Sequence, residues 1–154
     1  MKLSSDVLKA LEGRTLATAE SCTGGGIGNA ITAVSGSSAV YKGGIISYCN
    51  AVKAALLHVD ARLLETQGAV SAPVAEAMAN GARSALQADV AVSTTGLAGP
   101  GADEFGNPVG TVYIGYADEK SIISRKYHFL GDRESVRSQA VRAALELILE
   151  MFRK

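Results

Sequence analysis

The sequence predicts an α/β fold in which a mixed β-sheet carries helices on both of its faces. Three observations lead to this prediction. Short apolar stretches alternate with longer amphipathic stretches through most of the chain. Two β-rich stretches then flank a short polar turn, which is typical of an antiparallel hairpin. The chain closes with an amphipathic stretch that predicts a final helix.

The first third of the chain predicts alternating helices and strands. Residues 4–13, SSDVLKALEG, have apolar side chains at helical spacing and end on a glycine, which predicts a short helix. The apolar TLATA of residues 15–19 predicts a buried strand, and a glycine-rich turn then leads into a helix over residues 24–34. Residues 43–49 predict a second strand, and Asn50 is placed to cap the helix that follows it.

The middle third predicts two helices and a third strand. Asp60 is placed to cap a short helix over residues 60–67. Ser71 is placed to cap the next helix, over residues 72–87, which has a proline in its first turn and apolar residues at helical spacing. The apolar stretch 88–96 predicts a strand that ends in hydroxyl side chains and a glycine.

The last third predicts a loop, the hairpin and the final helix. Residues 97–110 are rich in glycine and contain two of the three prolines of the chain, which predicts a long loop. The stretches 110–117 and 121–129 predict the two strands of the hairpin. The final helix is expected to begin near Gly131 and Asp132, and its inward residues are Val136, Ala140, Ala144, Leu147 and Met151.

Length and composition limit the classes of protein to which the chain can belong. Its 154 residues, 47% of them hydrophobic, suit one domain with a real core, and no repeat or linker divides them. Lys and Arg number 15, as do Asp and Glu, so net charge gives no general attraction to nucleic acid or membrane. The sequence has no membrane-spanning stretch or signal-peptide core, and its two cysteines, Cys22 and Cys49, make no disulfide framework. We therefore expect a soluble cytoplasmic protein with reduced thiols.

Three segments rich in glycine or hydroxyl side chains follow the predicted strands. They are ESCTGGG at residues 20–26, SYCNAVK at 47–53 and STTGLAGPG at 93–101. In mixed sheets of this kind, ligands bind in the crevice at the carboxyl ends of the parallel strands. We therefore expect the three segments to meet there, where the glycines let a small ligand approach the backbone.

Ser21 is the first candidate nucleophile. It lies between a predicted strand end and a glycine-opened helix, where backbone N–H groups could hold an oxyanion or a phosphate. The alternative is a helix-capping role, which the local pattern alone favours because serine is common at helix starts. Cys22 is a rival nucleophile, but its base would have to be His58 or His128, and both are expected to be structural. P-loop and dinucleotide-binding spacings are absent from the sequence, and two scattered histidines argue against a zinc site.

Lys53 is the candidate base. If Asn50 caps its helix, Lys53 is the third helical residue and faces the positive end of the helix dipole. It could be a solvated lysine with a small penalty, or a lysine whose charged form is disfavoured so that it accepts a proton. Because the dipole contributes about 0.3–1 kcal/mol, most of the required lowering of the pKa would have to come from burial. Tyr48, at the strand end, could donate a hydrogen bond into the same site or fill the core.

Two further features are candidates for the walls of a binding site. The loop over residues 97–110 is long for a connection between core strands, and such loops often form a binding wall, although an ordinary surface connection is the alternative. Arg133 and Arg137 lie one turn apart at the start of the final helix, where they could bind a phosphate. For at least one of these two arginines we expect a solvated position instead.

The motifs together resemble one known family. TAESCTGG, the GSS of residues 36–38, SYCNAVK, GAVS at 68–71, TTGLAGPG, PVGTVYIG and GDRESVR follow in the order seen in the CinA C-terminal domain family. The resemblance covers nearly the whole chain, so residues 1–154 are expected to form a single such domain. It implies a three-layer α/β/α sandwich with a mixed, mostly parallel sheet, which agrees with the fold predicted above. Larger members carry an additional N-terminal pyrophosphatase domain, so this chain resembles the stand-alone form.

The resemblance also implies an activity. The enzymatic members of the family are nicotinamide-nucleotide amidases, which implies hydrolysis of nicotinamide mononucleotide to nicotinate mononucleotide and ammonia, without a metal or another cofactor. By resemblance, Ser21 is the nucleophile and Lys53 is the base, with Tyr48 beside them.

Further residues are expected to bind the substrate. The backbone N–H groups around Thr23, Gly24 and Gly25 are candidates for holding the oxyanion. The partner implied is a small-molecule nucleotide, with no nucleic acid or membrane partner, and the family implies a homodimer. The other expected substrate-binding residues are Ser38, Thr95, Gly96, Gly99 and Arg137.

Two alternatives of another class remain. One is a non-catalytic nucleotide-binding module that uses the same crevice. The other is a regulatory protein related to competence or DNA damage, although the neutral net charge argues against direct DNA binding. One departure from the family pattern is visible, because SYCNAVK has Cys49 where a serine is more common.

Overall fold

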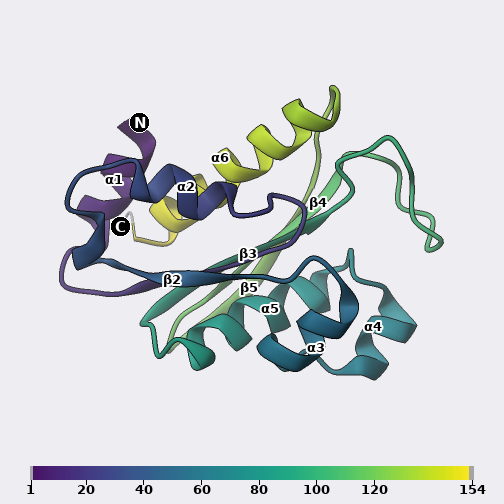
Figure 1. Ribbon diagram of the computed structural model, residues 1–154, viewed down its shortest axis with the longest axis horizontal. Helices are drawn as coiled ribbons and strands as arrows, with labels where there is room; N and C mark the ends of the chain where they lie inside the picture. Colours follow the sequence, from purple (N-terminus) through teal and green to yellow (C-terminus); the bar gives the residue numbers. More distant parts are fainter. Residues whose placement is uncertain (1, 153–154) are drawn as a thin grey trace.

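The computed structural model describes residues 2–152 (Figure 1). Within this range the chain forms six α-helices, one short 3₁₀ helix and five β-strands. In chain order the elements are α1 (Lys2–Ala10), β1 (Leu16–Glu20), α2 (Gly26–Thr32), the 3₁₀ helix η1 (Ser37–Ala39), β2 (Tyr41–Ile46), α3 (Asn50–Leu57), α4 (Ala61–Gln67), α5 (Ala72–Ala85), β3 (Val90–Gly96), β4 (Thr111–Ala117), β5 (Ile122–His128) and α6 (Arg133–Phe152).

The described strands form one five-stranded sheet in the order β2-β1-β3-β4-β5. β1 pairs in parallel with both β2 and β3, whereas the β3–β4 and β4–β5 pairs are antiparallel. β5 therefore runs in the same direction as β3, and β4 is the one described strand that runs against the others. This confirms the mixed sheet, mostly of one direction, and the C-terminal hairpin followed by a helix.

The sheet is the middle layer of three. In Figure 1, α1, α2 and α6 cover one face of the sheet, and α3, α4 and α5 cover the other. Leu16 of β1 packs in the core on the first face, whereas Ala17 and Ala19 pack in the core on the second. This alternation follows from the pleat, since successive side chains of a strand point to opposite faces. The predicted three-layer α/β/α sandwich is therefore confirmed.

Small residues let α5 approach the sheet closely. Ala75, Ala79 and Ala82 of α5 are buried. A Cβ atom on Gly115 of β4 would lie 2.2 Å from the carbonyl oxygen of Ala75, so a glycine is needed at this contact. Ser93 Oγ of β3 donates a hydrogen bond of 2.6 Å to the same carbonyl oxygen. The backbone of α5 therefore lies close to the sheet. The core on the other face of the sheet, beneath α1, α2 and α6, is richer in large aliphatic side chains.

The order of the strands places the carboxyl ends of β1, β2 and β3 at one edge of the sheet. From β1 the chain passes through α2 to β2 on one side, and from β2 through α3, α4 and α5 to β3 on the other side of β1. The connections that lead to β2 and to β3 therefore place these strands on opposite sides of β1. Ligand crevices form at such a point in sheets of this kind. Ser21 follows β1 directly.

β2 begins and ends earlier than the sequence predicted. It spans Tyr41–Ile46 rather than residues 43–49. The reason is its pairing with β1, which runs in register as far as Ile46 opposite Glu20. The N–H group of Ser47 then donates to the carbonyl oxygen of Glu20 at 2.8 Å, and the chain turns away from the sheet beyond this contact.

The prediction that Asn50 caps α3 is wrong. Cys49, with an extended backbone, is the N-cap residue, and Asn50 is the first residue of the helix. The side chain of Cys49 makes no capping hydrogen bond, so the local sequence carries no polar signal for this boundary. Lys53 is therefore the fourth residue of α3 rather than the third.

The other helix ends lie close to the predicted ones. Asp60 caps α4 as predicted, since its carboxylate accepts a hydrogen bond from the N–H group of Arg62 at 2.9 Å. Ser71 precedes α5 as predicted, but its hydroxyl group donates to the carbonyl oxygen of Gly68 instead of accepting from the helix. The first helix, α1, begins and ends a few residues earlier than residues 4–13.

α6 packs along the sheet with one face buried. Its predicted inward residues are buried in the structure, except for Met151, which is half-buried. The fully buried members of the predicted set are Val136, Ala140, Ala144 and Leu147.

No helix within residues 2–152 is both long enough and apolar enough to cross a membrane.

Candidate active site

A cleft of about 1090 Å³ opens at the carboxyl edge of the sheet. Its lining residues come from within segments 21–22 after β1, 48–54 after β2, 61–70 around α4 and 95–105 after β3, together with Arg133 of α6. The three segments that the sequence predicted to meet at the strand ends therefore reach one cleft.

Ser21 and Lys53 face each other in this cleft. Lys53 Nζ lies 3.0 Å from Ser21 Oγ and donates a hydrogen bond of 2.8 Å to the carbonyl oxygen of Ser47. The N–H group of Ser21 donates to the carbonyl oxygen of Thr94 at 3.1 Å, which fixes Ser21 at the end of β1. Ser21 is 8% exposed and Lys53 only 2%. The serine thus borders the cleft beside an amine that is almost sealed from water.

Burial lowers the pKa of Lys53 from its ordinary value of 10.5, because removal from water penalises the ammonium form. The thiols of Cys49 and Cys22 act in the opposite direction but more weakly. No carboxylate among the described residues forms a salt bridge with Lys53. The amine can therefore be neutral, and a neutral amine has a lone pair for the proton of Ser21 while it still donates to Ser47.

The side chain of Glu20, the residue before Ser21, caps the N-terminus of α2. Its buried carboxylate accepts hydrogen bonds from Thr23 Oγ1 at 2.6 Å, from the N–H group of Ile27 at 2.8 Å and from that of Gly28 at 3.0 Å. Thr23 Oγ1 also lies 2.8 Å from Thr94 Oγ1. The positive end of the α2 dipole is therefore occupied by a side chain of the protein itself.

Arg137 braces the turn that follows Ser21. Its Nε donates to the carbonyl oxygen of Cys22 at 3.0 Å, and its Nη2 donates to that of Thr23 at 3.2 Å. A Cβ atom on Gly24, whose φ is +58°, would lie 3.2 Å from the same Nη2. Arg137 is absent from the described residues that line the cleft, so the structure places this predicted phosphate ligand behind the turn that follows Ser21.

The glycine turn keeps two backbone N–H groups unused. The N–H group of Gly24 donates within the turn, to the carbonyl oxygen of Ser21 at 3.0 Å. By contrast, the N–H groups of Thr23 and Gly25 have no acceptor among the described residues. Gly25 has a φ of +101°, a conformation that favours glycine, and this sets the direction of its N–H group. These two donors are therefore unpaired among the described residues, but the described lining of the cleft includes neither Thr23 nor Gly25.

Tyr48 lies at the rim of the cleft and is 61% exposed. Its hydroxyl oxygen accepts a hydrogen bond of 2.9 Å from Arg133 Nη2, and Arg133 Nη1 donates to the carbonyl oxygen of Gly99 at 2.6 Å. These contacts join the end of β2, the loop after β3 and the start of α6. The sequence placed Tyr48 beside the serine and the lysine, whereas its hydroxyl group contacts Arg133 in the structure.

Thr95 and Gly96, at the end of β3, line the cleft as the sequence suggested. Thr95 Oγ1 donates to the carbonyl oxygen of Ala69 at 2.7 Å, so this hydroxyl group holds the connection between α4 and α5. A Cβ atom on Gly96 would lie 2.8 Å from the carbonyl oxygen of Thr111, so the position needs glycine for packing alone.

Ser38 is separated from these residues within the single chain. It is an exposed residue of η1, which directly precedes β2 and thus lies at the amino end of the strands, opposite the cleft. It is not among the described lining residues. The structure therefore does not bring Ser38 to the Ser21–Lys53 pair.

The rival nucleophile and bases are poorly placed. Burial raises the pKa of the Cys22 thiol to about 11, so the thiol is protonated near neutral pH. His58 and His128 are exposed, and the described lining of the cleft includes neither. Across residues 2–152, no group of three or more His, Cys, Asp or Glu side chains is arranged to hold a metal ion.

Sequence reasoning missed two contributors to the site. Glu20 had a usable signal, because a carboxylate at the end of a buried strand must find hydrogen-bond donors close by, and a helix start follows it. Ser47 had none, since it contributes its backbone carbonyl oxygen to Lys53, and no side-chain pattern reveals that contact.

The fold and the Ser21–Lys53 pair define an α/β domain with a serine–lysine site at the carboxyl ends of its parallel strands. The chain belongs to the CinA C-terminal domain family, whose sequence model matches residues 1–152. This match confirms the family resemblance that the ordered motifs suggested.

Similar proteins fall into long and short forms. A CinA-like protein of a Synechococcus species is 50% identical over 150 residues, which is 95% of this chain and 36% of that protein. The chain therefore spans about a third of the length of such relatives. The nicotinamide-nucleotide amidohydrolase PncC of Escherichia coli is 44% identical over 155 residues, which is 99% of this chain and 94% of that protein.

Solved structures of the family match the fold closely. A CinA superfamily protein of Klebsiella pneumoniae aligns with a TM-score of 0.95 and 35% sequence identity, over 98% of this chain and 96% of that one. A competence/damage inducible protein of Agrobacterium tumefaciens aligns with a TM-score of 0.94 and 36% identity, over 99% and 94% of the two chains.

Proposed function

We propose that the chain is an amidase that hydrolyses the carboxamide of nicotinamide mononucleotide to give nicotinate mononucleotide and ammonia. The observation that carries this proposal is the 3.0 Å separation between Lys53 Nζ and Ser21 Oγ beside an open cleft. The name of the E. coli relative, nicotinamide-nucleotide amidohydrolase, supports the same reaction.

The first half of the proposed reaction acylates Ser21. Neutral Lys53 accepts the hydroxyl proton as Oγ attacks the carboxamide carbon, and the carbonyl oxygen becomes an oxyanion. The intermediate collapses when the Lys53 ammonium gives this proton to the amide nitrogen. The C–N bond then breaks, ammonia leaves, and the nicotinoyl group remains bound to Ser21 as an ester.

The second half uses the same proton path with water. Lys53 accepts a proton from the water molecule that attacks the ester carbon, and returns it to Ser21 Oγ as the ester C–O bond breaks. The product acid loses its proton to solvent. Both residues are then in their starting states, so the cycle consumes one water molecule and requires no other reactant.

The proposed oxyanion donors are the N–H groups of Thr23 and Gly25, which follow the nucleophile. Donors that are fixed before the reaction stabilise developing charge most effectively. The contacts of Glu20 and Arg137 with this turn support such a role, because they restrain it from both sides.

Ammonia release from nicotinamide mononucleotide tests the proposal. The purified chain should release ammonia and nicotinate mononucleotide in equal amounts, and Ser21→Ala should abolish both. Ser138→Ala, on the exposed face of α6, is the matched control and should retain the activity. A Ser21→Ala protein that still releases ammonia at the original rate would reject the serine mechanism, and an inactive unsubstituted protein would reject the amidase.

The expectations about partners and location belong to the same proposal. A small nucleotide is the substrate class, with no nucleic acid or membrane partner, and the chain acts as a cytoplasmic homodimer. Size-exclusion chromatography with light scattering tests the dimer, and the ammonia assay with added DNA tests whether nucleic acid affects the reaction.

A further inference from the structure

Positive charge in the cleft is concentrated at one accessible residue. Lys53 and Arg133 are the cationic side chains among the described lining residues, and Lys53 is buried against Ser21. Arg133 is exposed, so it is the lining cation that a ligand in the cleft can reach. The acidic lining residues are Glu65, Asp103 and Glu104.

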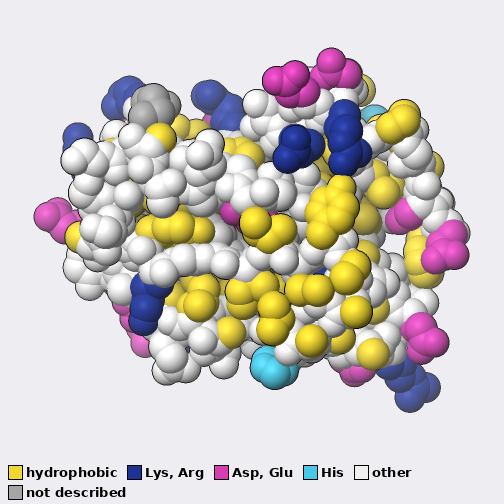
Figure 2. All heavy atoms as spheres, viewed as in Figure 1, with side chains coloured by type: hydrophobic (Ala, Val, Ile, Leu, Met, Phe, Trp, Pro, Cys, Tyr) yellow, Lys and Arg dark blue, Asp and Glu magenta, His cyan; other side chains and the backbone are white. Residues whose placement is uncertain are grey.

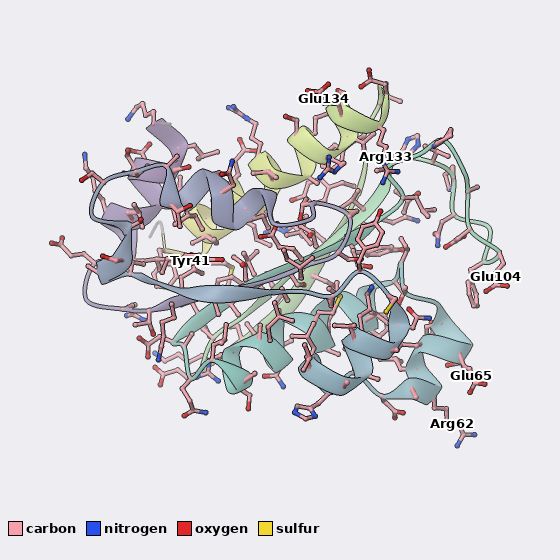
Figure 3. All side chains as sticks on the ribbon, in the orientation of Figure 1. Tyr41, Arg62, Glu65, Glu104, Arg133 and Glu134 are labelled. Atoms are coloured by element: carbon pink, nitrogen blue, oxygen red, sulfur yellow. The ribbon has the colours of Figure 1, made fainter. Side chains whose placement is uncertain are left out.

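The charged residues lie on different walls of the cleft. In Figure 3, Arg133 comes from the start of α6, Glu65 from α4 and Glu104 from the outer tip of the loop after β3. Figure 2 shows both Lys or Arg and Asp or Glu side chains near the start of α6, and hydrophobic side chains over α3 and α4. Of the charged residues at the start of α6, Arg133 is the one that lines the cleft within the described residues. An anionic group in the cleft is therefore favoured on the α6 side and disfavoured near α4 and the loop tip.

The guanidinium of Arg133 is held in place by neutral acceptors. Its two hydrogen bonds go to the carbonyl oxygen of Gly99 and the hydroxyl oxygen of Tyr48. A guanidinium has five N–H donors, so three remain for a ligand. No carboxylate of residues 2–152 forms a salt bridge with Arg133. The guanidinium of Arg133 is therefore held in a fixed position, and both of its hydrogen-bond acceptors are uncharged.

Two other candidate anion sites near Ser21 are less suitable. Arg137 donates to the carbonyl oxygens of Cys22 and Thr23, and it is not among the described residues that line the cleft. The N-terminus of α2 is closed by the carboxylate of Glu20, which would repel a phosphate.

We propose that Arg133 binds the phosphate monoester of the nucleotide and that Tyr48 positions its guanidinium. This inference rests on the proposed function for the identity of the substrate. The carboxamide end of the nucleotide lies at Ser21 and its phosphate end at the start of α6. Arg133 is then the residue by which the site selects a nucleotide over the corresponding riboside.

Binding measured without turnover tests this inference. Titration calorimetry on the Ser21→Ala protein compares nicotinamide mononucleotide with nicotinamide riboside, with and without Arg133→Gln. Loss of a charge-assisted phosphate contact should weaken nucleotide binding about 10- to 100-fold and leave riboside binding unchanged. Tyr48→Phe should weaken nucleotide binding less than Arg133→Gln, because Gly99 still holds the guanidinium.

The matched control and the pH dependence separate phosphate binding from a structural effect. Arg142→Gln removes an exposed arginine of the same helix that pairs with Glu146, and it should leave both affinities unchanged. The second ionisation of a phosphate monoester has a pKa of about 6. The effect of Arg133→Gln on nucleotide binding should therefore grow between about pH 5 and pH 7, because the dianion gains more from the arginine.

Each outcome decides the inference. Equal losses for nucleotide and riboside, equal affinity of the Ser21→Ala protein for both compounds, or absence of nucleotide binding would overturn it. Nucleotide binding that depends on Arg133, in a chain that releases no ammonia from nucleotide or riboside, would instead reject the amidase and leave the phosphate site standing.

Discussion

The N–H group of Ile27 donates a hydrogen bond of 2.8 Å to the carboxylate of Glu20, so the residue before Ser21 caps the helix that follows Ser21. The hydroxyl group of Thr23 and the N–H group of Gly28 are the other donors to this carboxylate. Together these charge-assisted hydrogen bonds offset the cost of burying Glu20. Because Ser21 lies between Glu20 and the capped helix, the same contacts fix the turn that carries Ser21.

Glu20→Gln should destabilise the protein. The amide can still accept a hydrogen bond through its oxygen, but its NH₂ group must face another donor. A buried donor without an acceptor costs about 1–3 kcal/mol in the free energy of unfolding. Urea unfolding followed by circular dichroism measures the change, with Glu12→Gln at an exposed position as the matched control. An unchanged free energy of unfolding for Glu20→Gln would contradict the capping role.

Lys53→Arg should be nearly as inactive as Lys53→Ala. A guanidinium stays protonated and cannot accept the proton of Ser21, although it keeps the positive charge. Ammonia release measures the effect, and Lys42→Arg, on the exposed side of β2, is the control that should keep its activity. An active Lys53→Arg protein would mean that position 53 supplies only charge, and that the base lies elsewhere.

The value of kcat/KM should rise with pH through the ionisation of Lys53, because only the neutral amine accepts a proton. Burial lowers the pKa of this amine, so the midpoint of the rise should lie below the ordinary lysine value of 10.5. Initial rates of ammonia release from pH 6 to pH 10 (about one unit apart) give the profile. A rate that is independent of pH across this range would count against a titrating lysine base.

The same lowered pKa predicts how stability depends on pH. Between the pKa of folded Lys53 and 10.5, the unfolded chain binds a proton that the folded chain has released. The free energy of unfolding therefore rises with pH through this window, and it gains nothing further from Lys53 above 10.5.

Lys53→Met isolates this contribution, because methionine does not titrate. The free energy of unfolding of the original protein minus that of Lys53→Met should increase with pH within the window. The lost hydrogen bond to Ser47 adds an offset that does not depend on pH. A difference that stays constant with pH would show that burial does not shift the ionisation of Lys53.

Arg137→Lys should lower kcat with little change in KM. An ammonium group cannot hold the carbonyl oxygens of Cys22 and Thr23 with the planar geometry of the guanidinium, so the turn after Ser21 loosens. Loss of one such hydrogen bond, about 1.5 kcal/mol, corresponds to roughly a tenfold fall in rate. Arg142→Lys is the control in the same helix. A rise in KM for the nucleotide at constant kcat would instead make Arg137 a phosphate ligand.

The fold could be predicted because its determinants are local. The apolar run TLATA predicts a buried strand, and in the structure Leu16 and Ala17 of β1 are buried in the cores on opposite faces of the sheet. The boundary at Asn50 could not be predicted, because β2 ends where its pairing with β1 ends, and this pairing joins segments far apart in the sequence.

Part of the site could also be predicted, because the strand ends are visible in the local sequence. The strand ends indicated which segments meet, and these segments do line the cleft. The direction of each side chain was not accessible to sequence patterns. Arg133 and Arg137 lie one turn apart on α6, yet one contacts Tyr48 at the rim of the cleft and the other contacts the backbone behind Ser21. This difference depends on the packing of α6 against the turn after β1.

The register of β1 against β2 sets the position of Ser21 relative to Ser47. Glu20 lies opposite Ile46 in this ladder, so the next residue along each strand is Ser21 on one side and Ser47 on the other. Ser21 carries the hydroxyl oxygen that lies 3.0 Å from Lys53 Nζ, and Ser47 accepts a hydrogen bond from the same amine. A slip of one residue would displace Ser47 by about 3.3 Å, which is more than a hydrogen bond can span.

Insertions and deletions are therefore not equivalent along this part of the chain. Additional residues in segment 33–40, before β2, would lengthen the connection and leave the register of β1 against β2 unchanged. The pairing is irregular at the start of β2, where Leu16 lies opposite Tyr41 and Ala17 opposite Gly43, and it is regular from Gly43 onward. A single residue added between positions 43 and 47 would shift the anchor of Lys53 relative to Ser21 and turn the later side chains to the opposite face. The tolerance of the protein to changes in length should thus end where the regular pairing begins, at Gly43.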